Sequence, residues 1–396
     1  MMSRKTSEKD VRKVSVLGST GSIGCSTLDI ILRNPSLYRV EVLTAHKSVE
    51  LLANQARRTQ ARLAVIGDKE KYAELKELLS GTETKVSAGR QALVEAAQYP
   101  VEWTMAAIVG AAGLEPTLAA VKQGSVVALA NKECLVCAGK FFLDEVAKSG
   151  TTLLPVDSEH NAIFQVLDIE QRDTVKKLIL TASGGPFWNT SIDSLRLVTP
   201  ERAVAHPNWN MGAKISVDSA TMMNKGLELI EAHYLFDMNE DMIDIVIHPE
   251  SIIHSLVSYI DGSVLAQLGS PDMRTPIAYA LGWPNRILSP SPTLNLAELG
   301  KLTFFEPDNR RFPLINLARE AIRVGGNASV IINASNEVAV KSFLDRRNCF
   351  LDIFKIVSRT LDKIKTRKIK CLEDVFDADE EARHVALDVA KLCEEG

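Results

Sequence analysis

Short apolar runs alternate with amphipathic stretches between residues 13 and 156. Runs of aliphatic side chains bounded by polar or glycine-rich segments predict strands, and apolar residues every three to four positions between them predict helices. This alternation predicts an α/β fold, with a doubly wound, Rossmann-like parallel sheet. The predicted strands are Val14–Leu17, Val40–Thr44, Leu63–Ile66, Met105–Val109, Val126–Ala130 and Thr152–Val156.

The pattern changes after this region. An apolar run at 176–182 predicts a strand of a second domain, and residues 183–213 follow with little periodicity, as in a functional or mobile loop. Residues 215–236 are largely helical. Two strand patterns within 252–268 flank Asp261-Gly262, which predicts a β-hairpin with a type I′ turn.

The remaining chain is proline-rich and then helical in its periodicity. We therefore predict a linker and a C-terminal helical bundle. The expected domains are a Rossmann-like domain at 11–156, a second α/β domain at 157–283 with a lid at about 183–213, a linker at 284–312 and a helical domain at 313–396.

Composition narrows the classes of protein. A chain of 396 residues is too long for one core, and 46% hydrophobic with 24% charged residues is ordinary for a globular protein. A net charge of −4 indicates no nucleic-acid or membrane-surface partner. No apolar stretch approaches the roughly 18 residues of a membrane span. Six cysteines do not make a disulfide framework, so we expect a cytoplasmic protein.

A glycine-rich loop lies between the first predicted strand and helix. Gly18, Gly21 and Gly24 let backbone N–H groups approach a pyrophosphate, although a glycine turn without a ligand is the alternative. An NAD site needs an acid after the second strand, to hold the ribose 2′-hydroxyl. His46-Lys47-Ser48 stands there instead, with Arg57 and Arg58 in the next helix, which favours the 2′-phosphate of NADPH.

Two acids bracket a serine where the strand at 152–156 ends. Ligands of open α/β proteins bind at this edge of the sheet. Asp157 and Glu159 offer oxygen ligands with no thiolate beside them, which suits Mg²⁺ or Mn²⁺. The alternative is an Asp that caps the following helix, with Glu159 merely solvated.

A second group of polar residues falls on one predicted helix. Asn224, Lys225 and Glu228 share a face, and Ser219 is expected near the helix start, where free N–H groups attract anions. This face could bind a phosphate and offer Glu228 to a metal. A Lys/Glu pair at this spacing is, however, most often a solvated salt bridge.

Other candidates have simpler interpretations. Cys134 and Cys137 form a C-x-x-C without a second pair, so small core residues are favoured over a redox site. His248 and His254 do not match a zinc helix and are interpreted as structural. Ser183 opens a Ser-Gly-Gly-Pro turn that could bind an anion.

Several longer motifs appear in one order along the chain: Gly18–Gly24, Ala130–Glu133, Pro155–Asn161, Thr181–Phe187, His206–Trp209, Lys214–Glu228, His248–His254 and Asp272–Pro276. Together they resemble the 1-deoxy-D-xylulose 5-phosphate reductoisomerase family, from about residue 13 to the helical C-terminus. His46 stands where that family often has glycine.

The resemblance implies a role for each matching residue. The implied catalytic residues are Lys132, Asp157, Glu159, His206 and Glu228, of which Asp157, Glu159 and Glu228 would hold the divalent ion. The implied substrate contacts are Lys132, Ser158, Glu159, Ser183, His206, Trp209, Ser219, Asn224, Lys225 and Glu228. The implied NADPH contacts are Gly18, Thr20, Gly21, Ser22, Ile23, Gly24, His46, Lys47, Ser48, Asn131, Glu133 and Gly212.

The implied activity is that of a homodimeric enzyme of non-mevalonate isoprenoid synthesis. With NADPH and Mg²⁺ or Mn²⁺, it would rearrange 1-deoxy-D-xylulose 5-phosphate and reduce the product to 2-C-methyl-D-erythritol 4-phosphate. Two alternatives are a simple NADP-dependent reductase of a phosphorylated sugar, which needs no acid cluster, and a catalytically silent NADP-sensing protein. The acid set and the phosphate face argue against the silent protein, whereas turnover without metal in the presence of a chelator would favour the simple reductase.

Overall fold

The computed structural model describes residues 11–209 and 211–394, and these form two compact units. The first unit combines residues up to Cys134 with Phe142–Asn161 and Asp272–Pro292. The second combines Leu135–Phe141 and Ala162–Pro271 with Thr293 onward. Each unit therefore consists of segments that are far apart in the sequence.

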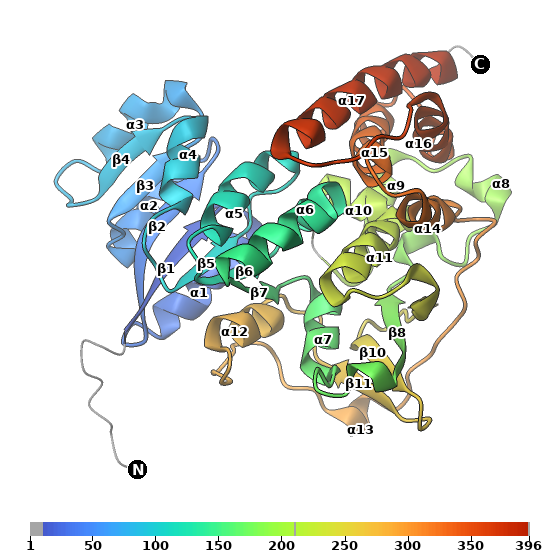
Figure 1. Cartoon of the computed structure of the whole chain (residues 1–396), viewed down its shortest axis with the longest axis horizontal. Helices are drawn as coiled ribbons and strands as arrows, with labels where there is room; N and C mark the ends of the chain where they lie inside the picture. Colours follow the sequence, from blue (N-terminus) through green and yellow to red (C-terminus); the bar gives the residue numbers. More distant parts are fainter. Residues whose placement is uncertain (1–10, 210, 395–396) are drawn as a thin grey trace. The chain divides into compact units, whose positions relative to one another are not determined.

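A parallel seven-stranded sheet organises the described part of the first unit, in the order β4-β3-β2-β1-β5-β6-β7 (Figure 1). Its strands bury near-continuous apolar residues, as expected for a parallel sheet covered on both faces. The strands are β1 Arg12–Leu17, β2 Tyr38–Ala45, β3 Leu63–Ile66, β4 Lys85–Ala88, β5 Trp103–Ala106, β6 Val126–Leu129 and β7 Thr152–Pro155.

The doubly wound parallel sheet predicted from the sequence is confirmed. The strand predicted at Met105–Val109 lies earlier, because the backbone leaves the sheet after Ala106 and Val109 is 82% exposed. Strand β4 was not predicted. It is a partly exposed edge strand whose sequence, Lys-Val-Ser-Ala, contains no apolar run.

Helices follow the strands of this sheet as predicted. They are α1 Ser22–Arg33, α2 Val49–Thr59, α3 Tyr72–Leu78, α4 Arg90–Ala97, α5 Leu114–Val121, α6 Glu133–Ser149 and α7 Ser158–Val166. Helix α12 Arg274–Gly282 also belongs to this unit, although it follows β11 of the second sheet in the sequence. Helix α6 is kinked at Gly139, whose φ of 34° is non-helical. An added Cβ there would lie 2.4 Å from the Tyr234 ring, so the close approach requires glycine.

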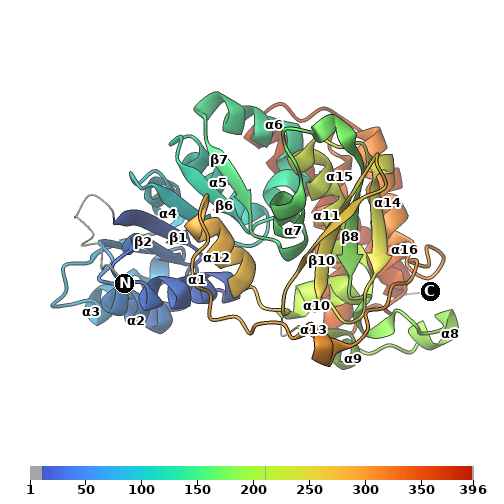
Figure 2. The ribbon, with the colours of Figure 1, turned by 90° about the horizontal axis from the view of Figure 1, so that it is seen from below.

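A four-stranded mixed sheet organises the described part of the second unit, in the order β11-β10-β8-β9. The strands are β8 Val175–Ala182, β9 Ile243–Ile247, β10 Ile253–Tyr259 and β11 Val264–Leu268. Figure 2 shows β8 and β10 side by side, with α11 (Met223–Phe236) alongside. Leu178 and Leu180 of the sheet pack with Leu229 and Phe236 of α11 in one buried cluster.

The predicted hairpin is confirmed by the antiparallel pairing of β10 with β11. The predicted type I′ turn is wrong, since that turn needs positive φ at both central residues. Only Gly262 has one, 90°, and its N–H donates to the Tyr259 carbonyl at 3.1 Å. This is a three-residue loop with a left-handed glycine.

The C-terminal helical region is confirmed, with α14 Leu314–Val324, α15 Ala328–Leu344, α16 Asp352–Lys363 and α17 Leu372–Glu394. Shorter helices lie within the low-periodicity segments, α8 Ile192–Leu195, α9 Pro200–Val204 and α13 Leu296–Leu299, and α10 Ala213–Ala220 lies in the stretch predicted to be helical. Within the described ranges, no helix has the length and apolar character needed to cross a bilayer.

Candidate functional site

The glycine loop after β1 is shaped for close backbone approach. Gly18 has a φ of 84°, and an added Cβ would lie 2.5 Å from the Ala107 carbonyl oxygen. A Cβ on Gly24 would lie 2.4 Å from the Gly18 oxygen. Gly21, the N-cap of α1, offers no capping side chain, and the first turn of α1 contains no acid. The N–H groups at this helix start therefore suit an anion.

Residues 46–48 lie exposed at the carboxyl end of β2, beside the glycine loop. The Ser19 N–H donates to the Thr44 carbonyl at 2.8 Å, which ties the two segments together. Arg57 does not support the predicted basic pocket. Its guanidinium donates to the carbonyl oxygens of Leu78 and Ser80 instead. Residues 46–48 and the exposed Arg58 remain as local candidates for recognition of a 2′-phosphate.

Asn131 connects the end of β6 to the loop after β5. Its Nδ2 donates to the carbonyl oxygens of Ile108 and Gly110. The buried Oδ1 accepts no hydrogen bond from any residue that the structure describes. A ligand that donates to Oδ1 would satisfy this acceptor. Glu133 begins α6, and Gly212 is the N-cap of α10 in the second unit.

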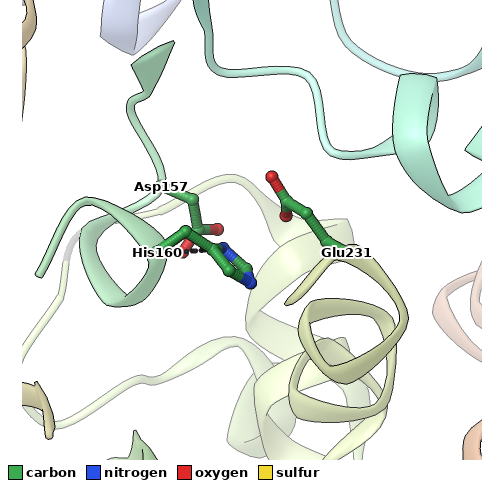
Figure 3. Close-up of side chains that lie close together, drawn as sticks. All are labelled: Asp157, His160 and Glu231. Carbon is green, nitrogen blue, oxygen red and sulfur yellow. Dashed lines mark ion pairs between the residues drawn. The ribbon is translucent and has the colours of Figure 1, made fainter. Parts of the chain in front are cut away.

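Asp157 is a nearly buried carboxylate with two cationic or ionisable neighbours in its own unit. Lys132 Nζ lies 2.8 Å from Oδ2, and the side chains of Lys132 and Asp157 are only 10% and 12% exposed. The fully buried His160 places Nδ1 3.3 Å from Oδ1 (Figure 3). Burial acts to raise the pKa of Asp157, but Lys132 and His160 hold it well below its usual value. Asp157 is therefore ionised at neutral pH.

The helix-capping alternative for Asp157 is partly right. The Glu159 N–H donates to Asp157 Oδ1 at 3.3 Å, at the start of α7. Ser158 donates from Oγ to Glu159 Oε2 at 2.6 Å. The ion pair with Lys132 adds a second role that no local cap explains. His160 was not singled out from the sequence, although its i, i+3 spacing from Asp157 was a usable signal.

Helix α11 contains charged side chains that are almost completely buried. Lys225 is 3% exposed and Glu228 1%, and the two form an ion pair. Asn224 donates to the same carboxylate. The expectation of a solvated salt bridge is wrong here, because burial removes the pair from water. Charged side chains are rarely buried unless they are paired, because burial removes them from water. This buried, charged face of α11 is therefore a candidate functional site.

Ser219 does not lie near the start of a helix. Helix α10 ends at Ala220, and Met222, with a φ of 62°, separates it from α11. The largely helical character predicted for 215–236 is confirmed, and the stretch consists of two helices. Ser219 is in the last turn of α10, whereas Asn224 and Lys225 are in the first turn of α11, where free N–H groups occur.

His206 and Ser183 are brought together by the segment after β8. His206 Nε2 lies 2.9 Å from Ser183 Oγ. His206 Nδ1 accepts from the N–H groups of Asn208 and Trp209 at 3.2 and 3.0 Å, so the ring proton of the neutral form is on Nε2. Burial lowers the pKa of His206, which favours this neutral form. The Gly185 N–H also donates to Ser183 Oγ, at 3.2 Å.

The Ser183 turn lies against Ser219. A Cβ added to Gly185 would be 2.7 Å from the Ser219 carbonyl oxygen, so the two backbones are in close contact. Within the second unit, the turn that begins at Ser183 thus lies against the end of α10, the helix that contains Ser219. Cys134, Cys137 and His248 are buried, in line with their structural interpretation.

Comparisons with known proteins identify the same family over most of the chain. Family models described as 1-deoxy-D-xylulose 5-phosphate reductoisomerase, its C-terminal domain and DXP reductoisomerase C-terminal domain match residues 14–139, 153–236 and 268–385. The reductoisomerase of Rhodospirillum centenum is 56% identical over 95% of this chain and 94% of its own length. That of Zymomonas mobilis is 56% identical over 94% and 96%.

Solved structures show the same similarity. The Zymomonas mobilis reductoisomerase in complex with NADPH has a TM-score of 0.93 at 54% identity, covering 96% of this chain and 99% of that one. A DOX-P reductoisomerase with NADPH, fosmidomycin and magnesium has a TM-score of 0.92 at 43% identity, covering 98% and 100%.

Proposed function

The chain belongs to the 1-deoxy-D-xylulose 5-phosphate reductoisomerase family, and from this premise we propose which of its residues perform the reaction. The protein is an NADPH- and divalent-cation-dependent oxidoreductase that converts 1-deoxy-D-xylulose 5-phosphate in isoprenoid synthesis. The observation that carries the residue assignment is the burial of charged groups at the matching positions, above all Lys132 with Asp157 and Lys225 with Glu228.

We propose Asp157, Glu159 and Glu228 as the cation ligands. All three are carboxylates, the donor type that Mg²⁺ and Mn²⁺ prefer, and Asp157 is held ionised by Lys132. When bound, the cation would polarise the oxygen atoms of the substrate, and NADPH would supply the hydride. Lys132 stabilises the charged form of Asp157 and, with Ser158, would contact the sugar backbone.

The phosphate of the substrate would bind to the second unit. Ser183, Ser219 and Asn224 offer neutral donors, and Lys225 offers a buried positive charge. The first-turn N–H groups of α11 add further donors. His206 and Trp209 would cover the bound substrate and keep water away from it.

NADPH would bind at the carboxyl edge of the parallel sheet. The glycine loop fits a pyrophosphate, because side chains at Gly18 or Gly24 would collide with backbone. Asn131 Oδ1 is a buried acceptor that a donor of the cofactor could satisfy. The exposed segment 46–48, with Lys47 at its centre, would recognise the 2′-phosphate.

The active form is proposed to be a homodimer. Strand β11 is an edge of its sheet and exposes Val264, Leu265 and Leu268 by 50%, 49% and 37%. An apolar edge strand with unpaired backbone groups favours pairing with a second copy. A cytoplasmic location is supported by the free state of all six cysteines.

One assay tests the assignment. Purified protein is mixed with 1-deoxy-D-xylulose 5-phosphate, NADPH and Mg²⁺, and NADPH absorbance is followed. We expect consumption that stops when a chelator is added and resumes with excess Mg²⁺. Absence of consumption would refute the function, and turnover that persists with chelator would favour a simple metal-independent reductase.

A further inference from the structure

Asn336 connects the C-terminal helices to α10, the helix that contains Ser219. It lies inside α15 and is fully buried. Its Nδ2 donates to Asp218 Oδ1 at 2.8 Å, across 118 positions of the sequence. Asparagine is a poor helix former and costly to bury, so a specific contact is the expected reason for its presence.

The Asp218 carboxylate depends on this contact. It is 1% exposed, and its other oxygen, Oδ2, lies 2.7 Å from Lys214 Nζ. Each carboxylate oxygen therefore has one donor, the ammonium of Lys214 from within α10 and the amide of Asn336 from α15. Removing either donor leaves a buried charged oxygen without that partner.

These contacts determine how α10 is oriented. Asp218 and Ser219 are consecutive, so their side chains point about 100° apart around the helix. Asp218 attaches one side of α10 to α15, while the Ser219 carbonyl oxygen packs against the backbone of Gly185. A rotation of α10 about its axis would break the first contact and turn the Ser219 hydroxyl away from its present direction.

We propose that Asn336 is a positioning residue for the phosphate end of the site. Through Asp218 it holds α10 in the orientation in which Ser219 donates to the phosphate of the substrate. This role rests on the proposed function and extends it to the C-terminal helices, which provide no substrate contact in that proposal. Asn336 itself touches neither substrate nor cofactor.

The test compares Asn336→Ala with Asn333→Ala. Asn333 is a matched control because it is fully buried in the same helix one turn earlier, and its Nδ2 donates to Glu337 at 3.2 Å rather than to α10. We expect Asn336→Ala to raise the KM for 1-deoxy-D-xylulose 5-phosphate about tenfold, with kcat and the KM for NADPH nearly unchanged. Asn333→Ala should lower the Tm without this selective change.

An exchange of the two groups provides the rescue experiment. Asn336→Asp alone places a second carboxylate opposite that of Asp218, and the repulsion between them should raise the KM for the substrate further. In the double variant Asp218→Asn/Asn336→Asp, the introduced amide can donate to residue 336 and accept from Lys214, so the KM should return toward the wild-type value.

Asn336→Ser covers the case in which Asn336→Ala does not fold. Serine keeps a polar side chain inside α15, but its hydroxyl is too short to replace the amide at Asp218 Oδ1, so the same selective rise in KM is expected. Equal KM changes in Asn336→Ala and Asn333→Ala, or a lowered Tm with unchanged KM, would overturn the proposal. If the wild type itself consumed no NADPH, the proposed function would fail instead, so the two failures are distinguishable.

Discussion

Replacing Ser183 with alanine is expected to weaken substrate binding through the loss of one hydroxyl hydrogen. Ser183 Oγ already accepts from the Gly185 N–H at 3.2 Å and from His206 Nε2 at 2.9 Å. Because His206 Nδ1 accepts from two backbone N–H groups, Nε2 has the proton and must be the donor. Both acceptor positions of the hydroxyl are therefore occupied, and its own hydrogen remains available for an oxygen of the phosphate.

The size of the effect follows from the charge of the acceptor. A hydrogen bond to a charged group contributes about 1.5–3 kcal/mol, which corresponds to a loss of roughly 10- to 150-fold in kcat/KM for Ser183→Ala. The loss should appear in the kcat/KM for 1-deoxy-D-xylulose 5-phosphate, measured from NADPH absorbance at saturating NADPH and Mg²⁺. The KM for NADPH should not change.

Ser191→Ala is the matched control, because its hydroxyl belongs to the same segment but caps α8 by accepting from the Ser194 N–H. It should leave kcat/KM unchanged. A loss below about threefold in Ser183→Ala, or an equal loss in Ser191→Ala, would show that the Ser183 hydroxyl does not donate to the phosphate.

Four further outcomes are expected. Asp157→Asn should abolish turnover while NADPH binding, measured by fluorescence titration, stays nearly intact; equal loss of both would mean that the metal site is misplaced. Lys47→Glu should raise the KM for NADPH more than that for NADH, and an unchanged ratio would refute recognition of the 2′-phosphate by this segment. Burial lowers the pKa of His206, and the neutral ring is the form that donates to Ser183, so the contribution of His206 to substrate binding is complete above about pH 6.5 and is lost as the pH falls through the lowered pKa. The KM for substrate should therefore rise more steeply toward acid pH in the wild type than in His206→Gln. Parallel pH profiles of the two proteins would contradict this. If the proposed dimer forms through the edge of β11, Leu265→Lys should convert it to a monomer in sedimentation experiments, whereas an unchanged mass would exclude this edge as the interface.

Local sequence patterns were sufficient to predict those parts of the structure that depend mainly on residues close together in the chain. The strands of the parallel sheet other than β4 and the C-terminal helices follow from periodicity, and the β10–β11 hairpin follows from two strand patterns that flank Asp261-Gly262. Strand β4 could not be predicted, because a polar edge strand has no apolar run. The break at Met222 was missed because both flanking segments have helical patterns and only the left-handed φ of 62° separates them.

The tertiary structure decided which charged side chains are buried and which residues far apart in the sequence form hydrogen bonds with each other. The sequence alone determined that two carboxylates follow β7, that a glycine loop opens the first helix, and that Lys225 and Glu228 share a helical face. It could not determine that this pair is buried, nor that Asp218 finds Asn336 118 positions away. Periodicity reports which side chains lie on one face, whereas the free energy of a charge depends on what covers that face, and the covering elements come from distant parts of the chain.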